Sequence, residues 1–180
     1  MILEDKKIIF VHAPRTSGTS IEKSVLNGGM VPDHQKHLRA SFFKSALGDE
    51  WNKYFKFTIV RNPWDRVVSL YHQVFHANYG IRTGKSLDFF LENYRPAPWE
   101  YGIQCSDYAD EEMDLVIKME DRERGLKELN EKTGLNIDAD LKERVRPRKL
   151  KSYKDYYDPS TEQKVRDIFA RDISLYDYEF

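Results

Sequence analysis

The segment from His12 to Ser20 combines residue types that can bind an oxyanion. It follows an apolar run, residues 8–11, and reads His12-Ala13-Pro14-Arg15-Thr16-Ser17-Gly18-Thr19-Ser20. Where a strand turns into a helix, the first backbone N–H groups and the helix dipole attract anions. Gly18 permits close approach, Arg15 adds a permanent charge, and four hydroxyl side chains add donors: Thr16, Ser17, Thr19 and Ser20. The segment predicts an anion site, and the alternative is simply a capped helix.

A second segment repeats this order of strand, turn and helix over residues 57–71. Arg61 stands at the end of the apolar run, where an arginine beside a helix start is well placed to bind phosphate. Ser69 lies two turns into the predicted helix, on a face that can point back toward the same ligand. Asp65 and Arg66 are open to another interpretation, an ion pair on the surface.

The nucleotide-binding P-loop, Gly-x-x-x-x-Gly-Lys-Ser/Thr, offers a comparison for the first segment. Aligning Gly18 with its second glycine places Ala13 at the first glycine, Thr19 at the lysine and Ser20 at the Mg²⁺-binding position. The lysine that contacts the transferred phosphate is therefore missing. This difference argues against an ATP- or GTP-driven motor.

Both segments are embedded in an alternating pattern of strands and helices. Strands are predicted at residues 8–11, 55–60 and 115–119, and helices follow each of them, the third ending at Gly134. Such alternation is typical of an α/β fold with a central parallel sheet and helices on both faces, three layers in all. Ligands bind such sheets beyond the carboxyl ends of the strands, where both segments lie. We expect one domain, residues 1–180.

The last helix is predicted to begin near Pro159. The spacing of Ser160 and Gln163 fits a capping box, in which two side chains satisfy the first backbone donors of a helix. Val165, Ile168 and Phe169 are expected to face inward.

Composition narrows the class of protein. The 29 basic and 30 acidic residues give a formal net charge of −1, so no long-range attraction for nucleic acid is expected. Cys105 is the only cysteine, which excludes an intramolecular disulfide and a cysteine-based zinc site. No apolar run approaches the roughly 20 residues of a membrane span. We expect a soluble protein of a reducing, cytoplasmic compartment.

Together the two segments resemble the two cofactor motifs of the sulfotransferase superfamily, in particular the branch that acts on carbohydrates and has small bacterial members. Residues 156–180, and Gln104 with Asp107-Tyr108, are similar to that branch as well. The resemblance implies a P-loop-like fold and 3′-phosphoadenosine 5′-phosphosulfate (PAPS) as sulfuryl donor, with no metal. The first motif would bind the 5′-phosphosulfate and the second the 3′-phosphate, and the acceptor would be a hydroxyl group of a saccharide.

The resemblance also implies a catalytic base, because an alcohol is a poor nucleophile at neutral pH. Lys36-His37-Leu38-Arg39-Ala40 matches the Lys-His-x-x-Ala context of the family's base, so His37 is the predicted base and His34 the second choice. Arg15 occupies a position where the family usually has lysine. Arginine keeps the charge and can stabilise the leaving group, but it cannot donate a proton to it.

Other candidates are less specific. His72 and His76 have a spacing seen in metal sites, for which surface or packing roles are preferred here. A basic stretch, residues 142–154, lies where the family closes over the nucleotide, and Arg148 and Lys149 are the predicted phosphate contacts. Trp99 is a candidate for contact with an acceptor, although packing is the preferred role.

Two further functions stay open at this level. One is a P-loop kinase that uses ATP and Mg²⁺, with Met119-Glu120-Asp121 supplying the acid that holds the metal. The other is a non-catalytic module that binds nucleotide phosphates or sulfated glycans. Dependence on Mg²⁺ would identify the kinase, and binding of nucleotide without turnover would identify the module.

Overall fold

The computed structural model describes residues 1–76, 86–93, 103–138 and 152–180, apart from the side chains of residues 33, 34, 75 and 76. The described residues form two compact units. The first contains residues 1–60 and 103–138, and the second contains residues 61–76, 86–93 and 152–180.

The first unit is built on a sheet with the strand order β1-β2-β3-β4. Its strands are β1 (Ile2–Leu3), β2 (Ile8–Val11), β3 (Phe55–Val60) and β4 (Leu115–Lys118). β2, β3 and β4 are mutually parallel, with Val11 opposite Thr58 and Val60 opposite Lys118. The prediction of a parallel sheet is confirmed for these three strands, whereas the short edge strand β1 runs antiparallel to β2 and makes the sheet mixed.

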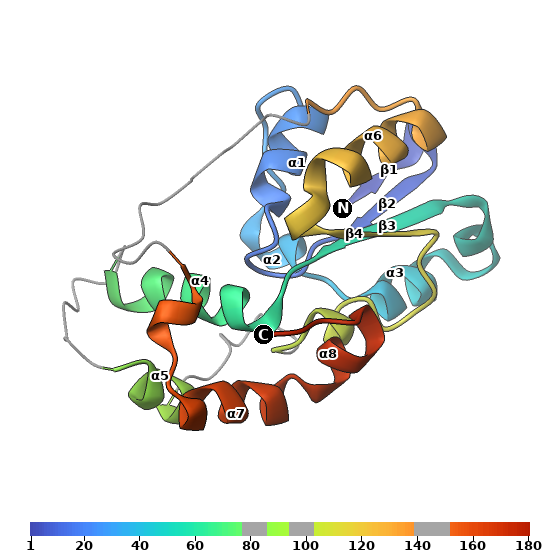
Figure 1. Cartoon of the computed structure of the whole chain (residues 1–180). Coiled ribbons are helices and arrows are strands. Elements are labelled where there is room, and N and C mark those ends of the chain that lie inside the picture. The colour runs from blue at the N-terminus through green and yellow to red at the C-terminus, as the bar shows by residue number, and fades with distance from the viewer. Residues whose placement is uncertain (77–85, 94–102, 139–151) are drawn as a thin grey trace. The chain divides into compact units, whose positions relative to one another are not determined.

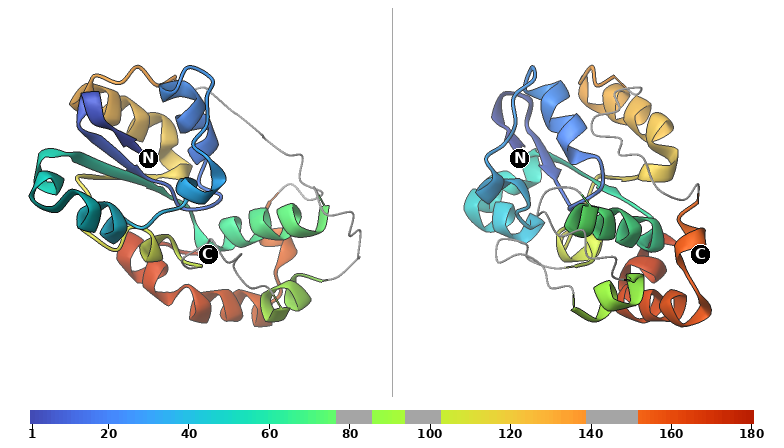
Figure 2. Two further views of the ribbon diagram at one scale, coloured as in Figure 1. Left: turned by 180° about the vertical axis from the view of Figure 1, so that it is seen from behind. Right: turned by 90° about the vertical axis from the view of Figure 1, so that its left-hand side faces the viewer.

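Helices cover both faces of this sheet (Figures 1 and 2). On one face α1 (Gly18–Val25) and α6 (Arg122–Thr133) enclose an apolar core with alternate strand residues, among them Phe10 and Ile117. On the other face lies α3 (Ala40–Leu47). Because both faces are covered, residues 8–11 are all buried, which explains the continuous apolar run of β2.

Short elements complete this unit. They are α2 (Asp33–Lys36) and the 3₁₀ turns η1 (Glu4–Lys6), η2 (Gly48–Lys53), η3 (Cys105–Asp107) and η4 (Met119–Asp121). α6 ends at Gly134, as predicted, and this glycine adopts the left-handed conformation. Cys105 is fully buried. A Cβ atom on Gly125 would lie 2.4 Å from Ile117 Cγ2, so this glycine allows α6 to pack closely on β4.

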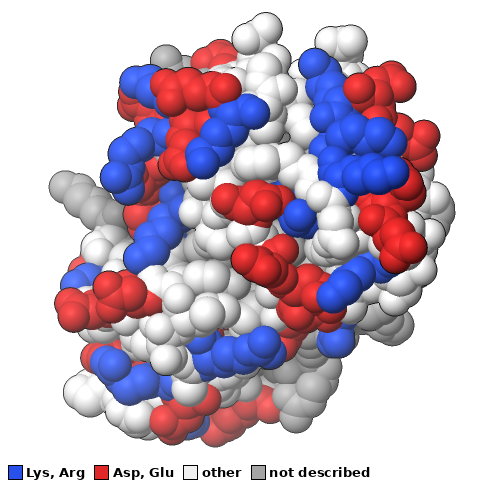
Figure 3. Space-filling model, turned by 90° about the vertical axis from the view of Figure 1, so that its right-hand side faces the viewer, with Lys and Arg blue, Asp and Glu red and all other residues white. Residues whose placement is uncertain are grey.

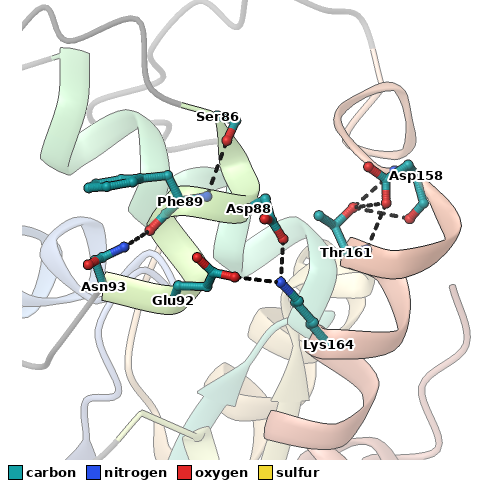
Figure 4. Close-up of polar contacts among 8 residues, drawn as sticks. All are labelled: Ser86, Asp88, Phe89, Glu92, Asn93, Asp158, Thr161 and Lys164. Carbon is teal, nitrogen blue, oxygen red and sulfur yellow. Dashed lines mark hydrogen bonds and ion pairs between the residues drawn. The ribbon is translucent and has the colours of Figure 1, made fainter.

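The second unit is helical. It contains α4 (Pro63–His76), α5 (Leu87–Asn93), η5 (Lys154–Tyr156), α7 (Pro159–Ile168) and α8 (Ala170–Tyr176). The indole N–H of Trp64 donates to the carbonyl of Glu162 at 3.1 Å, which joins α4 to α7. Lys164 of α7 contacts Asp88 and Glu92 of α5 at 2.6 and 3.0 Å (Figure 4).

Two predictions about the last helix are wrong. The N-cap is Asp158, whose carboxylate accepts the backbone N–H of Thr161 at 2.8 Å, and not Ser160 (Figure 4). Val165 and Phe169 are buried as expected, but Ile168 is 37% exposed. The helix ends at Ile168 and α8 starts at Ala170, so a single helical period does not run through both segments.

None of the helices in the described part of the chain has the length and apolar character that crossing a membrane requires.

Candidate functional site

The loop between β2 and α1 has an unusual backbone. Arg15 and Ser17 have φ angles of 68° and 66°, in the left-handed region that non-glycine residues rarely adopt. Left-handed residues within such a turn direct successive N–H groups toward one side and form an anion-binding concavity. Each costs of order 1–3 kcal/mol and persists only where the surrounding structure holds it. These two angles are compatible with the predicted phosphate or sulfate site.

Hydroxyl groups in this loop divide into two kinds. Thr16 is fully buried, and its hydroxyl donates to the carbonyl of Ala13 at 2.8 Å, so this side chain holds the turn together. Ser17 is the N-cap of α1 but makes no side-chain cap bond, and it is half-buried together with Arg15 and Thr19. The predicted ligand-binding residues of the first segment are thus brought together in one turn, with Gly18 and the buried Ser20 opening the helix.

His12 lies beneath the start of α1. Its ring stacks on Phe10, with centroids 5.3 Å apart, and a Cβ atom on Gly18 would lie 1.9 Å from His12 Nε2. A side chain at position 18 would therefore overlap the His12 imidazole, so glycine is needed there whether or not a ligand approaches the loop. The sequence suggested only the approach of a ligand as the reason for this glycine.

A buried cluster of polar side chains connects His12 to Glu22 of α1 and Lys36 of α2. His12 Nδ1 lies 2.8 Å from Glu22 Oε1, and Lys36 Nζ lies 3.5 Å from Glu22 Oε2. The exposed fractions of these side chains are 4% for His12, 1% for Glu22 and 9% for Lys36. A buried carboxylate is stable only when it is paired, and here two partners share it.

The titration of the pair follows from this burial. Burial lowers the pKa of His12 below its usual value, and the hydrogen bond to Glu22 only partly opposes this effect. Burial alone would raise the pKa of Glu22, but His12 and Lys36 outweigh it and hold that pKa below its usual value. Near neutral pH Glu22 is therefore ionised and His12 is neutral, with its hydrogen on Nδ1 facing the carboxylate.

His37 comes directly after α2 and contacts His12, the residue at which the loop between β2 and α1 begins. Its Nδ1 lies 2.9 Å from the carbonyl oxygen of His12, and its ring contacts the edge of the His12 ring at 4.5 Å between centroids. A carbonyl oxygen can only accept, so Nδ1 carries the hydrogen and the lone pair of the neutral ring is on Nε2. His37 is half-buried, next to the fully buried Tyr108. This is the tautomer that a base acting through Nε2 requires.

The second predicted segment begins at the end of β3. Since β2 and β3 are parallel neighbours, each of the two segments starts from the carboxyl end of a strand in the same sheet. Thr58 donates to the carbonyl of Val11 at 2.8 Å and ties the two strand ends together.

Within the second unit, Arg61 Nε donates to Asp65 at 2.7 Å, and this contact orients the guanidinium. Asn62 accepts the N–H groups of Trp64 and Asp65 at 3.1 and 3.4 Å, so it caps α4. The surface interpretation of Arg66 is wrong, because this side chain is 1% exposed. Asn before a proline at the first helical position signalled this cap, which the sequence analysis missed.

The structure describes some of the remaining predicted residues, and others lie outside the described part of the chain. Ser69 is 9% exposed on α4. His72 Nε2 lies 2.7 Å from the Tyr156 hydroxyl, in a cluster of aromatic rings. Among the described residues no group of three metal-binding side chains occurs. The side chains of His34 and His76 lie outside the description, as do three predicted residues: Trp99, Arg148 and Lys149.

Glu22 and Lys36 are the two members of the cluster whose roles the sequence did not signal. Neither lies at a spacing that marks an ion pair, since 14 positions separate them.

Comparisons with known proteins identify the family of this chain. The model of the sulfotransferase family matches residues 1–102. Carbohydrate sulfotransferase 10 of Gallus gallus is 33% identical over 113 residues, which are 54% of this chain and 27% of the relative. The proteins of the same name from Xenopus laevis (32%; 55% and 28% covered) and Danio rerio (27%; 54% and 27% covered) also match. The matched region spans about a quarter of each relative. No solved structure matches at a significant level.

Proposed function

Because the chain belongs to the sulfotransferase family, we propose that it transfers a sulfuryl group from PAPS to a hydroxyl group of a carbohydrate. The observation that carries this proposal is the loop from His12 to Ser17. There a left-handed turn at a helix start stands beside a histidine with its lone pair on Nε2. The printed name of the relatives, carbohydrate sulfotransferase, supports the class of acceptor.

In this proposal the first segment binds the 5′-phosphosulfate of the donor. Backbone N–H groups at the start of α1 and the hydroxyls of Ser17, Thr19 and Ser20 supply donors, while Thr16 keeps the turn in shape. Arg15 supplies charge to the leaving phosphate. The second segment binds the 3′-phosphate through Arg61 and Ser69, with Asp65 orienting Arg61. Arg148 and Lys149 are proposed to add contacts to the phosphates.

His37 is the proposed catalytic base. Its Nε2 accepts the proton of the acceptor hydroxyl as the oxygen attacks sulfur. The bond from sulfur to the 5′-phosphate oxygen breaks, and 3′-phosphoadenosine 5′-phosphate (PAP) leaves with the bonding electrons. Arg15 stabilises the negative charge on this phosphate without donating a proton. The reaction in this form needs positioning and electrostatic stabilisation more than covalent chemistry by the protein.

A cytoplasmic location and the organisation of the chain as one sulfotransferase domain remain part of the proposal.

Calorimetry with PAP, ATP and GTP tests the donor. We expect PAP to bind without Mg²⁺ and more tightly than ATP or GTP, and Arg61→Ala to abolish most of that affinity. Arg124→Ala is the matched control, because Arg124 also pairs with a nearby carboxylate, Asp121, but on an exposed surface. Tighter binding of ATP, or loss of affinity in the control alone, would contradict the proposal.

Transfer from PAPS to a panel of saccharides tests the base. His37→Ala should lower kcat by about 100- to 10,000-fold and leave PAP affinity unchanged. His72→Ala serves as control, since His72 is engaged by Tyr156 in the second unit. Unchanged turnover in His37→Ala would remove His37 from this role.

A further inference from the structure

We propose that Glu22 is a positioning residue for His37, because its buried carboxylate holds the two chain segments that carry and contact this histidine. The inference rests on the proposed role of His37 as catalytic base. It assigns no contact with donor or acceptor to Glu22 itself.

The first connection runs through His12. Glu22 Oε1 accepts the Nδ1 hydrogen of His12 at 2.8 Å and thereby fixes the ring beneath α1. The main-chain carbonyl of this same residue accepts the Nδ1 hydrogen of His37 at 2.9 Å. The His12 ring also contacts the His37 ring directly, with centroids 4.5 Å apart, so a displacement of the ring that Glu22 holds would reach His37 through this contact.

The second connection runs through Lys36. Its Nζ lies 3.5 Å from the other carboxylate oxygen of Glu22, an ion-pair distance, and this residue precedes His37 directly in the chain. It ends α2, a helix of only four residues, which has little stability of its own. The ion pair between Lys36 and Glu22 connects this short helix to α1. His37 is therefore positioned both by its hydrogen bond to the His12 carbonyl and by the preceding residue, Lys36.

Burial makes this arrangement specific. A buried ion pair contributes little net stability compared with apolar side chains of similar size, because removing charges from water is costly. The two hydrogen bonds of the cluster, from His12 to Glu22 and from His37 to the His12 carbonyl, are directional and restrict the positions of both rings. We infer that the cluster serves placement of His37 more than it serves stability of the fold.

The substitution Glu22→Gln tests whether Glu22 serves the placement of His37 or only the stability of the fold. The amide oxygen can still accept from His12, but the charge opposite Lys36 is lost. We expect kcat to fall by about 10- to 100-fold, the cost of a small misplacement of a catalytic group, with the KM for PAPS and the affinity for PAP within about threefold.

The second part of the experiment measures kcat for Lys36→Met and for the double variant with Glu22→Gln. If both substitutions act through one ion pair, the double variant should lose no more activity than the more damaged single variant. Glu128→Gln is the matched control, because Glu128 and Lys132 form a pair of the same length, 3.5 Å, on the exposed side of α6. Full additivity of the two losses, or an equal loss in Glu128→Gln, would overturn the proposal.

Nitrogen-15 NMR of the histidine rings gives a readout that needs neither donor nor turnover. In the wild type, His37 should carry its hydrogen on Nδ1, and in Glu22→Gln the signal should shift toward the other tautomer. A purely structural role predicts a lower melting temperature with an unchanged His37 tautomer and unchanged kcat, and that result would overturn the proposal. If the wild-type protein neither binds PAP nor transfers sulfate, the proposed function fails, while the tautomer measurement still decides the positioning.

Discussion

Several residues in the first segment have structural reasons for their identity that are separate from ligand binding. Gly18 leaves space for the imidazole of His12, and Thr16 closes the turn through its hydroxyl. The left-handed angles at Arg15 and Ser17 depend on these contacts, because nothing in the two residues themselves favours that conformation. The proposed binding of an oxyanion by this loop would therefore depend on side chains buried below it.

Substitution of Gly18 tests this dependence. Gly18→Ala would place a methyl group in the His12 ring, and we expect a loss of about 1–3 kcal/mol in the free energy of unfolding together with weaker PAP binding. In a His12→Ala background the same substitution should cost much less, which a double-mutant cycle by urea denaturation would show. Equal costs in the two backgrounds would mean that the ring is not the obstacle.

The pair of His12 and Glu22 predicts how stability depends on pH. Because burial lowers the pKa of His12 in the folded state, the unfolded chain binds this proton first as the pH falls through about 6.5. The free energy of unfolding should therefore decrease below that pH, until folded His12 also titrates. Glu22, whose folded pKa is also lowered, adds a further decrease as the pH falls below about 4.5.

Urea denaturation between pH 8 and pH 4 measures this dependence. His12→Asn should flatten the decrease between about pH 6.5 and pH 5, because asparagine does not titrate. A wild-type protein that becomes more stable as the pH falls from 7 to 5 would contradict the neutral state assigned to His12.

At the scale of the elements, capping side chains fix where α4 and α7 begin. Asn62 caps α4 directly after the end of β3, and Asp158 caps α7 at the position before Pro159. In both cases a polar side chain precedes a proline at the first helical position. This pattern explains why Asp158, rather than Ser160, satisfies the first backbone donors.

The cap of α7 is testable by two neighbouring substitutions. Asp158→Ala removes the acceptor of the Thr161 N–H and should lower Tm by roughly 2–4 °C. Ser160→Ala makes the control, because Ser160 provides no cap and its loss should change Tm by less than about 1 °C. Thermal unfolding followed by circular dichroism measures both, and a larger effect at Ser160 would restore the cap predicted from the sequence.

At the scale of the whole molecule, charge is balanced. The face shown in Figure 3 carries basic and acidic side chains interspersed with one another, consistent with the formal net charge of −1. In the proposed function, attraction for an anionic donor comes from local groups, which are Arg15 and the backbone donors of α1 in the first unit and Arg61 in the second.

Ligand linkage supplies a prediction at this scale. PAP at about 100 times its dissociation constant should raise Tm by roughly 5–10 °C in the absence of Mg²⁺, because it binds only the folded chain. ADP, which lacks the 3′-phosphate, should raise Tm less under the same conditions. Differential scanning fluorimetry with both nucleotides measures this difference, and an equal or larger shift with ADP would contradict the role of Arg61.

Much of this protein follows from its sequence. The patterns at residues 8–11 and 55–60 predicted β2 and β3 to the residue. The first is a continuous apolar run, as in strands buried on both faces, and the second interrupts its apolar residues with Lys56 and Thr58. The two segments after these strands, and the context of His37, identified the family without coordinates. These features can be predicted because strand ends, helix starts and turns depend mainly on residues that are close together in the sequence.

Only the tertiary structure decided which charged residues are buried and which partners they have. Glu22, Lys36 and Arg66 are polar side chains that a linear pattern assigns to the surface, yet all three are buried. The bonds from Glu22 to His12 and Lys36 join positions separated by 10 and 14 residues, with no periodicity that marks them. The cost of burying a charge is balanced by partners that folding brings together from separate segments, so only the folded chain reveals this cluster.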